Sequence, residues 1–223
     1  MLRVDISRHQ ISAIYAVCNA KQARLRSIWS ASFMDKIPIH VIGCDFPCKG
    51  SVLDREGRRI IDFRLQHQID SIEKHMGEVI IWSDVDIVFL DKIEKHVLKF
   101  IKGVDLCGIH EHLTNEEMNG GFLCIRCSKK TKKFFEMIRD DEGKKQFRFY
   151  EQDAMNRTWK KFGLSRRFLP ANRFSCYHYN PRPNLRNTVA YHVNSRPQDK
   201  IRIMMDTLSA ARKIRRLFAV KLL

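Results

Sequence analysis

Residues 79–90 constrain the fold more than any other part of this chain. They read Val-Ile-Ile-Trp-Ser-Asp-Val-Asp-Ile-Val-Phe-Leu. The run from Val79 to Trp82 lacks the polar alternation of a half-buried strand, so it predicts a strand that is apolar on both faces. Such strands lie in the middle of a sheet whose two faces are covered by helices. The sequence therefore predicts an α/β protein with a central, mostly parallel sheet flanked by helices.

The N-terminal part of the chain supports this fold class. An apolar run over 11–17 predicts a strand, helical spacing follows over 20–34, and a second strand is expected over 39–42. A strand, a helix and a strand in this order are typical of a βαβ unit with parallel strands. Residues 43–59 are rich in glycine and charge, which predicts a loop. The same patterns predict strands over 105–109 and 122–126, and helices over 60–75, 129–139, 151–162 and 199–223.

Two carboxylates follow the central strand directly. Asp84 and Asp86 are separated by one residue, and on an extended chain this spacing turns both side chains the same way. The carboxyl ends of strands in an open α/β sheet are where ligands bind. Two hard oxygen ligands at this position suit Mn²⁺ or Mg²⁺. A charged turn with Asp84 as a cap remains the simpler alternative.

Three further motifs carry side chains that suit ligand binding. Asn119-Gly-Gly121 predicts a turn that feeds a strand, and adjacent glycines let a ligand approach the backbone closely. Glu151-Gln-Asp153 lies at the start of a predicted helix, where capping of the helix dipole is the alternative role. Late in the chain, His192 is followed by Lys200, which could reach a phosphate or could be solvated.

Taken in this order, the four motifs resemble those of the nucleotide-diphospho-sugar transferases, glycosyltransferases of the GT-A fold. The chain is similar, more distantly, to the glycogenin and bacterial lipooligosaccharide galactosyltransferase group. The resemblance runs over roughly residues 11–204. It implies a GT-A-type, Rossmann-like domain over 1–206. It also implies a metal-dependent hexosyltransferase that moves a sugar from a nucleotide-diphosphate sugar, with a UDP-sugar favoured, to a hydroxyl of a glycan, glycolipid or glycoprotein.

The resemblance also implies a role for each matching residue. Metal ligands would be Asp84, Asp86 and His192. Catalytic residues near the reacting carbon would be Glu151, Gln152 and Asp153. The donor nucleotide sugar would be held by the following residues: Tyr15, Ala16, Val17, Arg24, Asp84, Asn119, Gly120 and Lys200.

The chain departs from the family pattern at two positions. Glu151 stands where an aspartate is usual, and the glycine expected between His192 and Lys200 is absent. The families imply transfer with retention of configuration. Retention needs either a nucleophile on one face of the sugar or front-side attack. Glu151 or Asp153 could be that nucleophile, and an inverting enzyme would use one of them as general base.

The sequence also leaves room for three other functions. A strand followed by Asp84-Val-Asp86 also resembles the first motif of aspartate-nucleophile phosphatases, in which Asp84 would attack phosphorus. A net charge of +16 fits nucleic acid, an anionic membrane or phosphorylated small molecules as partners, but no nucleic-acid-binding motif is present. Cys124 and Cys127 have a zinc-like spacing, yet residues three apart on a strand face opposite sides.

The last predicted helix is basic and amphipathic. Residues 199–223 hold seven basic and two acidic side chains, with the basic ones largely off an apolar stripe. Helices of this kind lie on anionic membranes or pack on a core with a solvated face. We treat 207–223 as this separate helix, able to pack on the same domain. No apolar leader is visible at the N-terminus, so we expect a cytoplasmic protein, peripheral on the cytoplasmic face of a membrane.

Overall fold

A six-stranded mixed sheet forms the centre of the computed structural model, which describes residues 10–46, 55–141 and 150–220. The strand order is β2-β1-β3-β6-β5-β7. Strand β6 is antiparallel to β3 and β5, whereas the other pairs are parallel, so the predicted mostly parallel sheet is confirmed. The strands of this sheet are β1 (Ile11–Cys18), β2 (Ile39–Gly43), β3 (Val79–Ser83), β5 (Leu106–His110), β6 (Met118–Arg126) and β7 (Arg166–Phe168).

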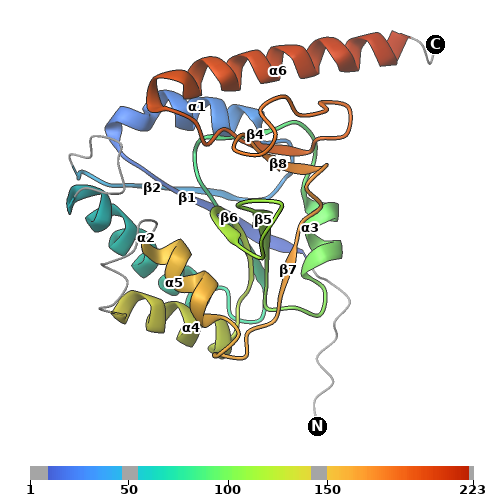
Figure 1. Cartoon of the computed structure of the whole chain (residues 1–223). Helices are drawn as coiled ribbons and strands as arrows, with labels where there is room; N and C mark the ends of the chain where they lie inside the picture. The colour runs from blue at the N-terminus through green and yellow to red at the C-terminus, as the bar shows by residue number, and fades with distance from the viewer. Residues whose placement is uncertain (1–9, 47–54, 142–149, 221–223) are drawn as a thin grey trace.

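Helices cover both faces of the sheet, as Figure 1 shows. A small second sheet, in the order β4-β9-β8, lies on the side of α1 and α6. Its strands are β4 (Ile87–Phe89), β8 (Phe174–Cys176) and β9 (Ala190–His192). The helices are the 3₁₀ turn η1 (Ala20–Gln22), α1 (Ala23–Ser32), α2 (Arg55–Lys74), α3 (Glu94–Ile101), α4 (Lys129–Asp140), α5 (Tyr150–Thr158) and α6 (Pro197–Val220).

The central strand β3 separates two apolar cores. Val79 and Ile81 pack in the core that contains Trp29 of α1, whereas Ile80 and Trp82 pack in the core that contains Leu65 of α2. All of β3 is buried, as a strand covered on both faces must be. The prediction that Val79–Trp82 is apolar because both of its faces are covered is therefore confirmed.

Several elements differ from the sequence predictions. Helix α2 begins at Arg55, inside the predicted loop 43–59, of which residues 47–54 lie outside the described part. Asn119-Gly-Gly121 lies within β6 and not in a turn. Helix α3 and strand β7 were not predicted, because each is short and its mixed composition shows no clear hydrophobic period. None of the described helices is long and apolar enough to span a bilayer.

The described cysteines are free thiols and all are buried. Cys124 packs in one core and Cys127 in the other, on opposite faces of the sheet. The geometry therefore argues against a zinc site built on these two residues, as the strand spacing predicted. Cys48, four residues after Cys44, lies outside the described residues.

Candidate active site

The sequence-predicted carboxylates lie at the edge of the sheet where β3 ends. Asp84 follows the last residue of β3, and Asp86 precedes the first residue of β4. The link between them is a turn and not extended chain, so the i, i+2 argument does not apply. The two side chains nevertheless converge, because the turn carries the chain from the large sheet into the small one.

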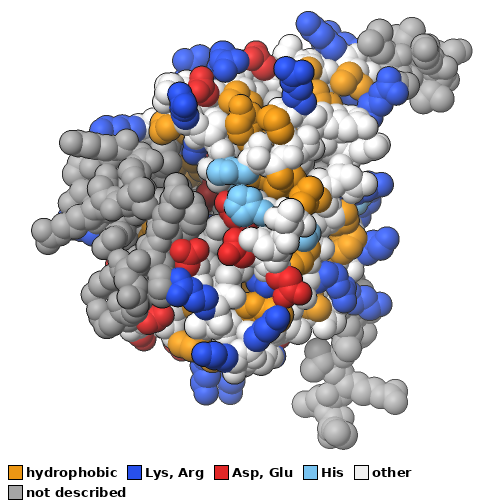
Figure 2. Space-filling model, viewed as in Figure 1, with side chains coloured by type: hydrophobic (Ala, Val, Ile, Leu, Met, Phe, Trp, Pro, Cys, Tyr) orange, Lys and Arg blue, Asp and Glu red, His pale blue; other side chains and the backbone are white. Residues whose placement is uncertain are grey.

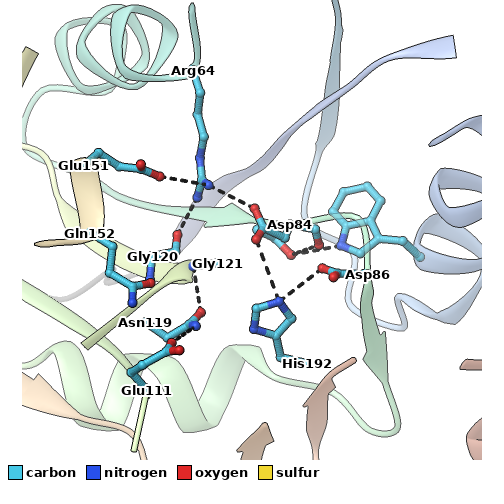
Figure 3. A network of polar contacts seen from close by, with 12 residues as sticks. Arg64, Asp84, Asp86, Glu111, Asn119, Gly120, Gly121, Glu151, Gln152 and His192 are labelled. Carbon is cyan, nitrogen blue, oxygen red and sulfur yellow. Dashed lines mark hydrogen bonds and ion pairs between the residues drawn. The ribbon is translucent and has the colours of Figure 1, made fainter. Parts of the chain in front are cut away.

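The pairing of β4 with β9 brings a histidine to the carboxylates. Ile87 lies opposite His192 in the antiparallel ladder, and the Val193 N–H donates to the Asp86 carbonyl at 2.9 Å. The His192 Nε2 atom lies 3.1 Å from Asp86 Oδ1 and 3.8 Å from Asp84 Oδ2. One ligand atom from each of these three residues lies within 4.8 Å of the others, which is a group that can hold a metal ion. Figure 3 shows the three side chains turned toward one another.

The electrostatics of the cluster suit a divalent cation. Burial raises the pKa of Asp86, but His192 and Lys200 outweigh burial and hold that pKa below its usual range. Burial lowers the pKa of His192, whereas Asp86 outweighs it and raises that pKa well above its usual range. The buried Asp86 Oδ1 has no hydrogen-bond partner among the described residues. A buried carboxylate oxygen that makes no hydrogen bond and lies 3.1 Å from the His192 imidazole fits a bound cation.

Lys200, from the first turns of α6, reaches the same cluster. Its Nζ lies 2.6 Å from Asp86 Oδ2. Burial lowers the pKa of this ammonium, but Asp86 outweighs burial and raises it. The structure thus brings Lys200, which was predicted to contact the diphosphate, to Asp86. The ammonium sits where it can face both the carboxylate and an incoming anion.

Arg64 is a site residue that the sequence reasoning missed. Its Nη1 lies 3.0 Å from Asp84 Oδ1 and 3.7 Å from Glu151 Oε1, and its Nη2 donates to the Gly120 carbonyl. In Figure 3 the guanidinium lies between the two carboxylates. Arg64 is on α2, next to the core residue Leu65, and nothing in its sequence context marks it as more than one of many basic residues.

The first residues of β6 form the floor beside the carboxylates. The Asp84 N–H donates to the Gly121 carbonyl at 2.7 Å, which continues the β3–β6 ladder past its last pair. Asn119 is buried, with its amide nitrogen donating to Glu111 and its Oδ1 accepting from the Gly121 N–H at 2.7 Å. Glu111 was also missed, because a glutamate in a polar loop carries no signal of burial. These bonds fix the orientation of Asn119.

Helix α5 delivers the predicted catalytic segment to the same floor. The Gly120 N–H donates to Gln152 Oε1 at 2.7 Å, and Asn156 exchanges two hydrogen bonds with the Met118 backbone. Glu151 is 17% exposed, and burial raises its pKa to about 7 against the opposing effect of Arg64. Asp153 lies one residue beyond Gln152 and is half-buried; its charge contributes to the raised pKa.

The residues predicted to hold the nucleotide base differ in how far they are exposed. Tyr15 is 5% exposed, its ring stacked between His40 and Trp82, and Ala16 is fully buried. Val17 is half-buried and Arg24 is exposed on α1. The structure brings neither the Tyr15 ring nor Ala16 to the carboxylate cluster; both are core residues.

Figure 2 shows how the charged side chains are distributed on one face of the molecule. There, carboxylate and histidine side chains gather at the centre, and lysine and arginine side chains lie mostly around the margin. The basic excess is thus spread over the surface around a locally acidic site. An acidic centre inside a basic surround can bind a cation and still attract an anionic ligand.

Comparison with known families identifies the class of protein. The family model for nucleotide-diphospho-sugar transferases matches residues 71–204, which is more than half of the chain. The chain belongs to this family. The match includes Asp84, Asp86, Asn119, Glu151 and His192. The family assignment favours a glycosyltransferase over the phosphatase and nucleic-acid interpretations.

Solved structures of glycosyltransferases share the fold. A glycosyltransferase involved in glycosylation of the major capsid of PBCV-1 matches with a TM-score of 0.62 at 8% identity, covering 85% of this chain and 98% of that one. GlyE of Streptococcus pneumoniae TIGR4 matches with a TM-score of 0.61 at 12% identity, covering 95% and 64%. The galactosyltransferase LgtC, in complex with donor and acceptor sugar analogues, matches with a TM-score of 0.55 at 11% identity, covering 89% and 95%. No curated protein matches the sequence significantly.

Gly121 is required by the geometry of this site. A Cβ added there would lie 2.5 Å from His192 Cε1 and 2.7 Å from Asp84 Oδ2. A Cβ on Gly120, in the same strand, would meet Gln152 only at 3.5 Å, an ordinary contact. We expect Gly121→Ala to displace the cluster, to cost about 1–3 kcal/mol of stability and to abolish metal binding. Gly120→Ala should cost less.

Urea denaturation and isothermal titration with Mn²⁺ would measure both effects. Equal losses of stability and metal affinity in the two variants would contradict the steric argument.

Proposed function

We propose that this chain is a metal-dependent hexosyltransferase. It would transfer a sugar from a nucleotide-diphosphate sugar, with a UDP-sugar favoured, to a hydroxyl of a glycan, glycolipid or glycoprotein. The observation that carries the proposal is the convergence of Asp84, Asp86 and His192 within 4.8 Å, with Lys200 bonded to Asp86, in a chain of this family.

Asp84, Asp86 and His192 would hold Mn²⁺ or Mg²⁺. Their two carboxylates and one imidazole are ligands that these ions accept, with manganese the better match for the nitrogen. When bound, the ion supplies positive charge that offsets the growing negative charge on the departing diphosphate. Lys200 adds a second positive charge from the protein itself. Metal binding at His192 competes with the proton that Asp86 stabilises on its imidazole.

The donor sugar would lie on the floor formed by β6 and α5. Asn119 and Gly120 would contact its hydroxyls, with Glu151 and Gln152 facing the reacting carbon. The Gln152 amide nitrogen has no hydrogen-bond partner among the described residues, so it can donate to the sugar. Arg64 would hold Glu151 and Asp84 at a fixed separation and so act as a positioning residue. We propose retention of configuration, with Glu151 or Asp153 as the carboxylate.

The nucleotide would lie along the end of β1. Arg24 is exposed nearby on α1 and can reach solvent-side groups of the nucleotide. The side chains of Tyr15 and Ala16 are in the core, so any contact from this part of β1 would come through its backbone and Val17.

Helix α6 supports a proposal of peripheral membrane attachment. Its inner face carries Met204 and Ala211, which are buried against the core, whereas Arg212, Lys213 and Arg216 are exposed. In Figure 1 the C-terminal end of α6 extends past the body of the molecule. A basic helical face attracts anionic lipid headgroups by about 1 kcal/mol per charge. Such attachment would bring the enzyme to lipid-linked or surface glycan acceptors.

Donor binding should require the metal cluster. With a UDP-sugar at about 100 times its dissociation constant and Mn²⁺ present, we expect the Tm to rise by about 5–10 °C. The Asp86→Asn variant should lose this rise, because it removes a metal ligand while keeping the shape of the side chain. Differential scanning fluorimetry against a panel of UDP-, GDP- and other nucleotide sugars measures the effect.

The matched control is Asp91→Asn, five residues downstream and more than half exposed. This variant should keep the full rise. Stabilisation of the Asp86→Asn chain equal to that of the unmodified chain would exclude Asp86 as a metal ligand. Absence of any stabilisation by every nucleotide sugar with metal would exclude the donor class.

The raised pKa of Glu151 predicts a pH-dependent stability. The native carboxyl has a pKa of about 7 and an ordinary glutamate about 4.5. Between these values the native state keeps a proton that the unfolded chain has released, so the free energy of unfolding falls as pH rises. Glu151→Gln removes this fall, and we expect the variant to gain about 1–3 kcal/mol on the unmodified chain between pH 5 and pH 8.

Urea denaturation at both pH values, with Glu117→Gln at an exposed position as control, measures the gain. A stability difference that is the same at pH 5 and pH 8 would rule out a raised pKa at Glu151.

Charge on α6 should control vesicle binding. The triple variant Arg212→Glu, Lys213→Glu and Arg216→Glu should reduce sedimentation with vesicles of phosphatidylcholine and phosphatidylserine at least about tenfold. The same charge change on exposed residues before and within α3, Lys92→Glu, Lys95→Glu and Lys99→Glu, serves as the control. Equal losses would show that net charge alone drives binding, and no binding by the unmodified chain would remove the membrane proposal.

A further inference from the structure

An open pocket is lined by residues close in the chain to His192 and Lys200, and the proposed function assigns it no role. Its volume is about 760 Å³, within the range of small-molecule sites. Two connections form its walls, the one between β8 and β9 and the one between β9 and α6. The lining side chains are Tyr177, His178, Pro181, Asn194, Ser195 and Arg196, together with Asp199 at the start of α6.

Both walls are bonded to the cluster. The Tyr177 N–H donates to the His192 carbonyl at 2.9 Å, so the connection between β8 and β9 is hydrogen-bonded to the histidine backbone. Asn194 follows His192 by two residues along the other wall. Asp199 precedes Lys200, whose ammonium lies 2.6 Å from Asp86. The lining residues are therefore connected, along the chain and through this backbone bond, to His192 and Lys200.

The chemistry of the lining suits an uncharged molecule with many hydroxyls. Asn194 and Ser195 offer both donors and acceptors, which sugar hydroxyls need. Tyr177 offers an aromatic face, which is apolar on its surface and polar at its tip. The single charges of Arg196 and Asp199 cancel, with histidine counted as neutral.

The same charges argue against the diphosphate as occupant. A diphosphate in this pocket would face the Asp199 carboxylate, which lies 3.4 Å from Arg202. Like charges repel at such distances. Lys200 lies outside the lining and is directed to Asp86, so the anion site and this pocket are adjacent and separate.

We propose that this pocket binds the terminal sugars of a neutral oligosaccharide acceptor. The inference rests on the proposed function. The acceptor hydroxyl oxygen would form the new bond to the anomeric carbon on the face from which the diphosphate departs, as retention requires, while the bond from that carbon to the diphosphate oxygen breaks. The bonding electron pair leaves with the diphosphate, and the hydroxyl proton passes to it. Tyr177 and His178 are specificity-determining residues in this arrangement.

A printed glycan array with neutral, amino and acidic oligosaccharides tests the pocket directly. The labelled full chain, probed with Mn²⁺ and UDP, should bind neutral glycans. Tyr177→Ala and His178→Ala should each weaken that binding at least about tenfold, a loss of about 1.4 kcal/mol. Arg182→Ala, an exposed position in the same connection that does not line the pocket, is the control and should bind as the unmodified chain does.

Two variants are used because Tyr177 also packs against the core, whereas His178 is exposed and its loss should leave folding intact. Binding of acidic glycans alone, of no glycan, or of neutral glycans equally by both variants would overturn the inference.

Kinetics separate this inference from the proposed function. With a neutral glycan as acceptor, the His178→Ala variant should raise the KM for the acceptor more than the KM for the nucleotide sugar. An equal rise in both would assign the pocket to the donor and overturn the inference. If the unmodified chain neither binds nor hydrolyses any nucleotide sugar, the proposed function fails, whatever the glycan array shows.

Discussion

The pairing of β4 with β9 is the interaction on which the candidate site depends. The ladder sets Ile87 opposite His192 and so joins parts of the chain more than 100 residues apart. It places His192 within 3.1 Å of Asp86, and the same segment leads on to Lys200. The strands are three residues each, so the ladder alone contributes little, and burial of Ile87, Phe89 and Tyr191 in the core holds it in place. The convergence of Asp84, Asp86 and His192 is thus a product of core packing.

Electrostatic balance is the second constraint. Three basic side chains and four carboxylates meet at one edge of the sheet. Arg64 pairs with Asp84 and approaches Glu151, Lys200 and His192 pair with Asp86, and Glu111 accepts from Asn119. Because Glu151 has the weakest partner, at 3.7 Å, burial dominates its ionisation and its pKa rises. The site therefore holds an ionised carboxylate, Asp86, and a carboxyl group, Glu151, whose pKa is about 7. Acid–base catalysis uses pairs of titratable groups whose pKa values differ in this way.

Much of the fold could be predicted from sequence, and the reasons are physical. Four consecutive apolar residues, 79–82, predict that β3 is buried on both faces. The alternation of predicted strands and helices indicates the fold class. Short strands such as β7 and β8 could not be predicted, because three residues carry no period. The ordered motifs located Asp86 and His192, but Arg64 and Glu111 owe their roles to contacts across the fold, which local sequence does not record. Tyr15 illustrates the converse, since an aromatic residue near the end of a strand serves the core as readily as a ligand.

Helix α6 carries a site residue near its beginning and its exposed basic residues toward its end. Lys200 and Arg216 are sixteen residues apart on one continuous helix, which corresponds to about 24 Å along its axis. A continuous helix keeps its two ends at a constant distance from each other. Any surface that holds the far end of α6 therefore stands at a set distance from the carboxylates.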